Sequence, residues 1–201
     1  MTMNWQEFGA LIALASAMTF TPGPNTALST ALAANHGFKH ALRFICAVPA
    51  GWAILLTLCA SGVGAMILAA PNLQLGFKWV GAIYLLWLAW RLAQVKKLKE
   101  AESAMFELGF WKGTALQLVN FKAWMLALTI ASGWIVGHAD AISRFFWVLP
   151  ILLFFAFFSN LMYALLGSML RTWLALGSRL LWFNRFMSAL LVSTAFWTIN
   201  L

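Results

Sequence analysis

The chain has few charged residues. Only 9% of its 201 residues are charged and 63% are hydrophobic, with a mean hydropathy of +0.86. Soluble domains carry about 25% charged residues, so this composition excludes a soluble domain and predicts an all-α, multi-pass membrane protein. The net charge of +8 does not indicate nucleic acid binding, because the basic residues cluster in short loops between apolar spans.

Acidic side chains are absent from the interior of the apolar spans. The five carboxylates lie in loops or at span ends: Glu7, Glu100, Glu102, Glu107 and Asp140. A carboxylate proton relay within the membrane is therefore excluded, and export of metal ions is disfavoured for the same reason. His36 and His40 are four positions apart but have no acidic or cysteine neighbour, so we expect no metal there. No catalytic triad, Walker-type loop or cysteine cluster appears, and we expect neither enzyme activity nor a cofactor.

Cysteine is also scarce. Cys46 and Cys59 are 13 positions apart in one predicted helix, which separates them by about 20 Å. They cannot bond to each other within one subunit, which argues against a membrane-embedded thiol–disulfide carrier. The N-terminus lacks the basic region of a signal peptide, because residues 1–7 contain Glu7 and no Lys or Arg. We therefore expect the first span to be retained.

Six apolar spans are predicted, each long enough to cross a bilayer. They cover about 5–32, 41–70, 73–92, 113–136, 145–167 and 180–201. The polar stretch 95–112 separates residues 1–94 from residues 113–201, with three spans in each half. We expect two inverted three-helix repeats joined by a cytoplasmic linker.

Orientation follows from Lys and Arg, which accumulate in cytoplasmic loops. Ten basic residues fall on the side of the linker: Lys39, Arg43, Arg91, Lys96, Lys97, Lys99, Lys112, Arg171, Arg179 and Arg185. The opposite side holds only Lys78 and Arg144. Both termini are therefore predicted to lie outside the cytoplasm.

The first span is interrupted at mid-depth by Pro22, Gly23, Pro24 and Asn25. Neither proline donates a backbone hydrogen bond, so a regular helix cannot continue through them. Unpaired backbone at this depth is tolerated only where it is buried in protein or lines a polar cavity. In transporters such broken helices supply the substrate site. A proline kink that only shapes packing is the structural alternative.

The fourth span carries a matching polar interruption with Asn120 and Lys122. A lysine at the centre of a membrane helix costs about 3 kcal/mol on insertion scales, so we expect it to have a function that offsets this cost. It either meets a substrate carboxylate, exchanges a proton when the site is empty, or snorkels to the headgroups. The amides of Asn25, Asn120 and Asn160 suit both ends of a zwitterion, and Tyr84 is a secondary candidate contact.

These motifs resemble those of the LysE/RhtB family of bacterial amino-acid exporters over the whole chain. The resemblance rests on FTPGPN at 20–25, KWVGAIYL at 78–85 and LQLVNFK at 116–122. Many members have Asn-Pro-Lys where Asn120, Phe121 and Lys122 stand here. The proline that would break the second helix is therefore absent from this chain. Phe121, and Ser159 with Asn160 in the fifth span, are similar to the subgroup of cysteine and O-acetylserine exporters.

The resemblance implies a multi-pass protein of the bacterial inner membrane that exports small amino acids or their derivatives, driven by the proton motive force. A structural membrane subunit, or an exporter of a different small metabolite, is the alternative. The apolar outer faces must meet lipid or a partner. A homodimer is therefore one of the predicted arrangements.

Overall fold

The structure is a computed structural model that describes residues 3–98 and 108–200, and every regular element in these ranges is an α-helix. In chain order they are α1 (Trp5–Phe20), α2 (Pro24–His36), α3 (Phe38–Ala60), α4 (Val63–Ala69), α5 (Pro71–Ala93), α7 (Phe110–Val119), α8 (Phe121–Trp134), α9 (Ala141–Leu174) and α10 (Arg179–Asn200). The all-helical prediction is confirmed for this part of the chain. Half of the predicted linker 95–112, residues 99–107, lies outside the described residues.

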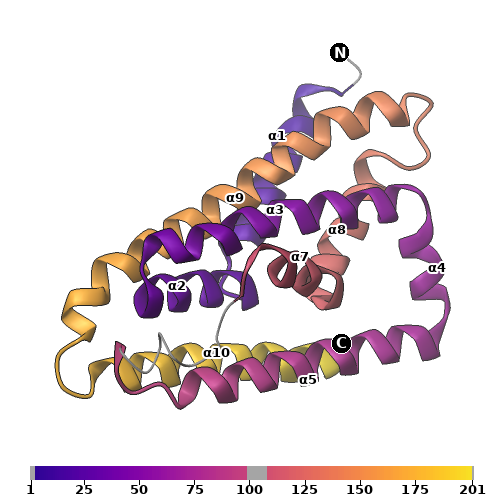
Figure 1. Cartoon of the computed structure of the whole chain (residues 1–201). Coiled ribbons are helices and arrows are strands. Elements are labelled where there is room, and N and C mark those ends of the chain that lie inside the picture. Colours follow the sequence, from indigo (N-terminus) through magenta and orange to yellow (C-terminus); the bar gives the residue numbers. More distant parts are fainter. Residues whose placement is uncertain (1–2, 99–107, 201) are drawn as a thin grey trace.

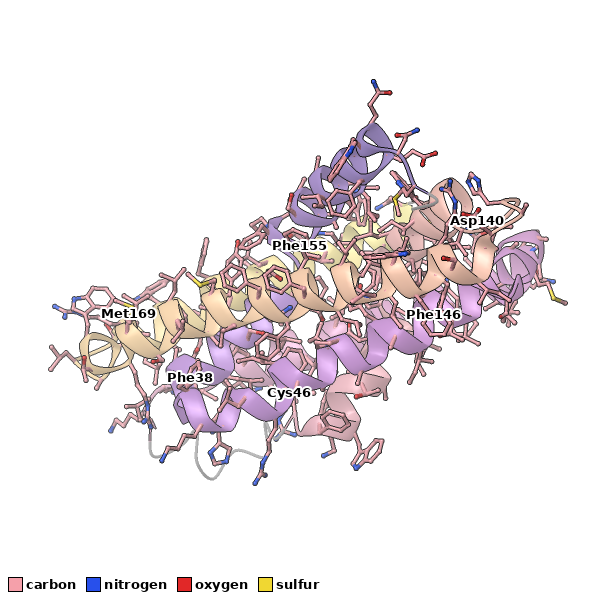
Figure 2. All side chains as sticks on the ribbon, turned by 90° about the horizontal axis from the view of Figure 1, so that it is seen from above. Phe38, Cys46, Asp140, Phe146, Phe155 and Met169 are labelled. Carbon is pink, nitrogen blue, oxygen red and sulfur yellow. The ribbon has the colours of Figure 1, made fainter. Side chains whose placement is uncertain are left out.

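The helices form two outer layers with shorter helices between them (Figure 1). In one layer α9 runs between α1 and α3, as the view from above shows (Figure 2). In the other layer α5 packs lengthwise on α10 (Figure 1). The short helices α2 and α7 fill the space between the layers (Figure 1), where α2 packs on α9 and α7 packs on α3.

Three of these helices, α3, α5 and α9, are each long and apolar enough to cross a membrane. The α7–α8 pair becomes a fourth if its two bent halves form one span. Large apolar side chains are also widely exposed, with Trp111 80%, Ile142 78% and Met169 75% accessible. An apolar surface of this extent fits contact with lipid. The six-span count, the repeats and the side of the termini stay predictions.

Helix boundaries refine the predicted spans. Within 41–70, α3 ends at Ala60 and α4 begins at Val63, because Gly62 adopts a left-handed conformation with φ 89°. The predicted span 145–167 lies inside α9, which has 34 residues and is therefore about 51 Å long. Helix α9 thus exceeds the thickness of a hydrocarbon core, which is about 30 Å.

The break between α1 and α2 follows from local proline chemistry. Thr21, the residue before Pro22, is extended with φ −64° and ψ 131°, as the proline ring requires. Pro24 then occupies the first turn of α2, where its missing N–H has no partner to lose. The Thr26 hydroxyl accepts a hydrogen bond from the Gly23 amide at 2.9 Å and so caps the new helix.

The second break, between α7 and α8, forms without a proline. The two helices bend by 70° at Asn120, so the predicted interruption of the fourth span is present. The indole N–H of Trp124 donates to the Leu118 carbonyl at 2.7 Å and satisfies an acceptor that the bend frees. Helix α5 approaches so closely that a side chain at Gly81 would collide with the Val119 carbonyl. A local hydrogen bond and a close tertiary contact therefore both accompany this break.

Helix α2 is the buried centre of the molecule. Eleven of its 13 residues are buried, and α9 approaches it so closely that a Cβ at Gly167 would collide with the Thr30 carbonyl. At its far end, the side-chain amides of Asn35 and Asn184 exchange hydrogen bonds of 2.7 and 3.0 Å with each other. Small side chains and amide pairs of this kind join helices in membranes.

Candidate functional site

A small cavity lies where the two helix breaks meet. Its walls come from the end of α1, the start of α2, the start of α8, and α3 and α9. It is lined by Met18, Thr19, Thr21, Gly23, Pro24, Asn25, Thr26, Trp52, Asn120, Lys122, Ala123, Leu126, Ala156, Ser159 and Asn160. Its volume is about 40 Å³, room for roughly three water molecules. Tertiary packing thus brings six of the eight predicted site residues to one cavity.

The helix ends give this cavity a polar character. Helices α2 and α8 begin at it, while α1 ends at it. The first N–H groups of a helix lack partners within the helix, and the helix dipole adds positive potential there. Two such N-terminal ends beside Lys122 make the cavity suitable for an anionic group.

Lys122 is the second residue of α8 and lies across from the first break. Its Nζ donates to the Thr21 carbonyl at 3.4 Å, one of the acceptors that α1 leaves free where it ends. A Cβ built on Gly23 would lie 3.3 Å from the same Nζ. The ammonium therefore bridges the two breaks. Within residues 3–98 and 108–200 the two ion pairs found involve Arg144 and not this lysine.

Asn25 is paired with Gln117, a residue that was not among those predicted for the site. The Asn25 amide donates to Gln117 Oε1 at 2.8 Å, and the Gln117 amide donates to Asn25 Oδ1 at 3.0 Å. Gln117 is fully buried and packs so tightly on α3 that a Cβ at Gly51 would collide with it. A polar side chain three positions before Asn120 in an apolar span is the signal that would have found it.

The other two amides differ in how they are satisfied. Asn160 Oδ1 accepts from the Ser29 hydroxyl at 2.8 Å, and its amide donates to the Ala156 carbonyl at 2.7 Å. Asn120 lines the cavity, and no hydrogen bond of its side chain is found in the described part of the chain. Asn160 thus joins α2 to α9.

The two remaining predicted residues lie outside this cavity. Pro22 lines an adjoining pocket between α1, α8 and α10. Tyr84 on α5 stacks on Trp87, with 5.7 Å between the ring centroids, and is not part of the cavity wall.

Other charged and thiol groups lie away from the cavity. Arg144 contacts Glu7 at 3.4 Å and Asp140 at 3.0 Å, joining the start of α1 to the start of α9. Cys46 and Cys59 are both free thiols on α3. Among the described residues no three or more His, Cys, Asp or Glu side chains gather as metal ligands would.

Known proteins match most of this chain. The family model described as LysE type translocator matches residues 16–199. A cysteine/O-acetylserine efflux protein of Salmonella typhimurium is 31% identical over 147 residues, which cover 73% of this chain and 75% of that protein. The protein of the same name from Escherichia coli K12 is 32% identical over the same shares. No solved structure matches the chain.

Proposed function

Because the chain belongs to the LysE type translocator family, we propose that it exports small neutral amino acids of the cysteine and O-acetylserine kind by proton-coupled alternating access. As a translocator it is a transporter and not an enzyme. The observation that carries the proposal is the cavity at the two helix breaks, where Lys122 and three asparagines come together. Its setting is the bacterial inner membrane, which the apolar helices fit.

In this proposal the chain crosses the membrane six times. Helices α1 and α2 form one broken span, and α7 and α8 form the other, so that residues 1–94 and 113–201 are inverted repeats with both termini outside. The packing supports this arrangement, since each broken span packs on the middle helix of the other half, while α5 pairs with α10. A site at the interface of two inverted repeats is typical of secondary transporters.

The groups around the cavity have complementary roles toward a zwitterion. Lys122 and the N-terminal ends of α2 and α8 bind the substrate carboxylate. The carbonyl of Thr21 and the amide oxygens of Asn25 and Asn120 accept hydrogen bonds from the substrate ammonium. Asn160 orients the wall of α2 through Ser29. The cavity of about 40 Å³ must widen to admit the substrate, as alternating access requires.

Lys122 also carries the coupling proton in this proposal. It is the only lysine among the residues that line the cavity, and no carboxylate is among them. When the substrate carboxylate leaves, the ammonium loses its anionic partner and can exchange a proton. Antiport of one proton supplies about 2.3 kcal/mol per 100 mV, which supports a roughly fifty-fold gradient of a neutral substrate.

The test measures export by purified protein in proteoliposomes loaded with labelled cysteine, O-acetylserine, threonine or leucine. The proposal expects pH-gradient-driven loss of one or two of the small substrates, and its abolition by a protonophore and by Lys122→Gln. Lys39→Gln removes a positive charge from an exposed position outside the cavity and is the matched control, expected to export normally.

Two results would overturn the proposal. Export that persists unchanged in Lys122→Gln would remove this lysine from both binding and coupling. No export of any of the four amino acids by correctly inserted wild-type protein would favour another metabolite or a structural subunit.

A further inference from the structure

The pocket that adjoins the cavity has a volume of about 460 Å³, against about 40 Å³ for the cavity itself. Ligand pockets in proteins measure about 300–1,000 Å³, so the larger pocket has room for a small amino acid. It lies between α1, α8 and α10, and Ser193, Thr194 and Trp197 form its α10 wall.

The pocket and the cavity share part of their walls. Met18, Thr21 and Lys122 line both spaces, so the two spaces adjoin at these three residues. Lys122 therefore presents its side chain to both spaces, and its Nζ is held across the boundary by the Thr21 carbonyl.

The α10 wall of the pocket combines two hydroxyl groups with an apolar surface. The hydroxyls of Ser193 and Thr194 donate to the Leu190 carbonyl at 2.9 and 2.8 Å, which leaves their oxygens able to accept hydrogen bonds. Trp197 supplies an apolar surface beside them. An amino-acid ammonium with a short side chain fits this combination of acceptors and apolar surface.

The position along α10 sets the direction in which the pocket opens. Ser193 and Trp197 lie in the last two turns of this helix, which ends at Asn200. The start of the helix carries Arg179 and Arg185, which places it at the cytoplasmic surface under the positive-inside rule. The pocket therefore extends from mid-depth toward the outer face.

We infer that this pocket is the exit vestibule of the exporter: it receives the substrate amino acid from the central cavity, and Lys122 with Met18 forms the partition between the two. The inference rests on the proposed export function and adds the route and the residues Ser193, Thr194 and Trp197. In this structure the vestibule is formed while the central cavity is contracted.

The test uses thiol accessibility in intact cells. Ser193→Cys is placed in a chain whose own thiols are removed by Cys46→Ala and Cys59→Ala, and an anionic, membrane-impermeant methanethiosulfonate is applied from outside. The matched control is Phe196→Cys, on the same helix, 59% exposed and outside the pocket wall. We expect Ser193→Cys to react at least about tenfold faster, because thiolates form in water and not in lipid. O-acetylserine, which has no thiol, should slow the reaction.

A second pair of variants tests whether filling the pocket blocks export. Ser193→Trp should lower export by about tenfold or more, because the added bulk fills the vestibule and obstructs the passage. Phe196→Trp, outside the pocket, should export normally.

The outcomes separate the vestibule from the export function. Wild-type export combined with a Ser193→Cys protein as unreactive as Phe196→Cys would show a lipid-filled groove and overturn the vestibule alone. Labelling of Ser193→Cys without export by the wild type would overturn the assigned occupant together with the proposed function. Fast labelling, protection by O-acetylserine and block by Ser193→Trp would together establish the exit route.

Discussion

Replacing Gln117 by leucine tests whether the two halves of the chain are joined at the cavity as the structure has them. The substitution removes two hydrogen bonds with Asn25, of 2.8 and 3.0 Å, and one to the Gly113 carbonyl of 3.1 Å. Leucine keeps most of the volume that packs against Gly51. The change therefore isolates the amide contacts.

The expected loss of stability follows from measured contributions of hydrogen bonds between membrane helices. These contributions average about 0.6 kcal/mol and reach about 1.7 kcal/mol per bond. The two bonds with Asn25 join different helices, and the bond to Gly113 lies within α7. We therefore expect Gln117→Leu to lower the free energy of unfolding by about 1–2 kcal/mol, close to tenfold in the unfolding equilibrium.

The assay is equilibrium unfolding in mixed micelles, followed by tryptophan fluorescence, on Gln117→Leu, Asn25→Leu and the double variant. A coupling free energy of about 1 kcal/mol is expected, because each single variant removes the same pair. Additive effects within about 0.3 kcal/mol would refute the pair.

The pair also has a predicted effect on transport. Gln117→Leu frees the Asn25 side chain at the cavity, so the substrate concentration for half-maximal export should rise. Asn184→Leu is the control, because it removes a similar amide pair with Asn35 at the other end of α2, about 15 Å along the helix. It should lower stability comparably and leave that concentration unchanged.

Three further substitutions have defined outcomes. Gly23→Val places a Cβ 3.3 Å from the flexible tip of Lys122, so the protein should fold while export falls by about tenfold or more; normal export would make the first break purely structural. Gly167→Ala drives a methyl into the backbone of α2 and should lower the free energy of unfolding by about 1–3 kcal/mol. Gly133→Ala has open space around the new methyl and should raise it by up to about 1 kcal/mol through helix propensity. Equal unfolding midpoints for the two variants would contradict this packing. Arg144→Gln removes two ion pairs and should lower the free energy of unfolding by about 1–3 kcal/mol, with a smaller difference at high salt; a salt-independent difference would refute the electrostatic cause.

Properties that depend on neighbouring residues alone were readable from the sequence. The apolar composition excludes a soluble domain, and the prolines at 22 and 24 stop a helix whatever surrounds them. Lys122, Asn120 and Asn160 stood out because polar groups are expensive inside apolar spans. These local and compositional rules predicted the helical class, the first break and six of the fifteen residues that line the cavity.

Contacts between distant parts of the chain were decided only by the tertiary structure. The second break has no proline, and α5 packs directly on it where Gly81 meets the Val119 carbonyl. Gln117 became a site residue because its amide reaches Asn25 at the start of α2, and Tyr84 fell outside because it stacks on Trp87 along α5. Sequence specifies where a helix must end, whereas the distance between two side chains on different helices depends on how the whole bundle packs.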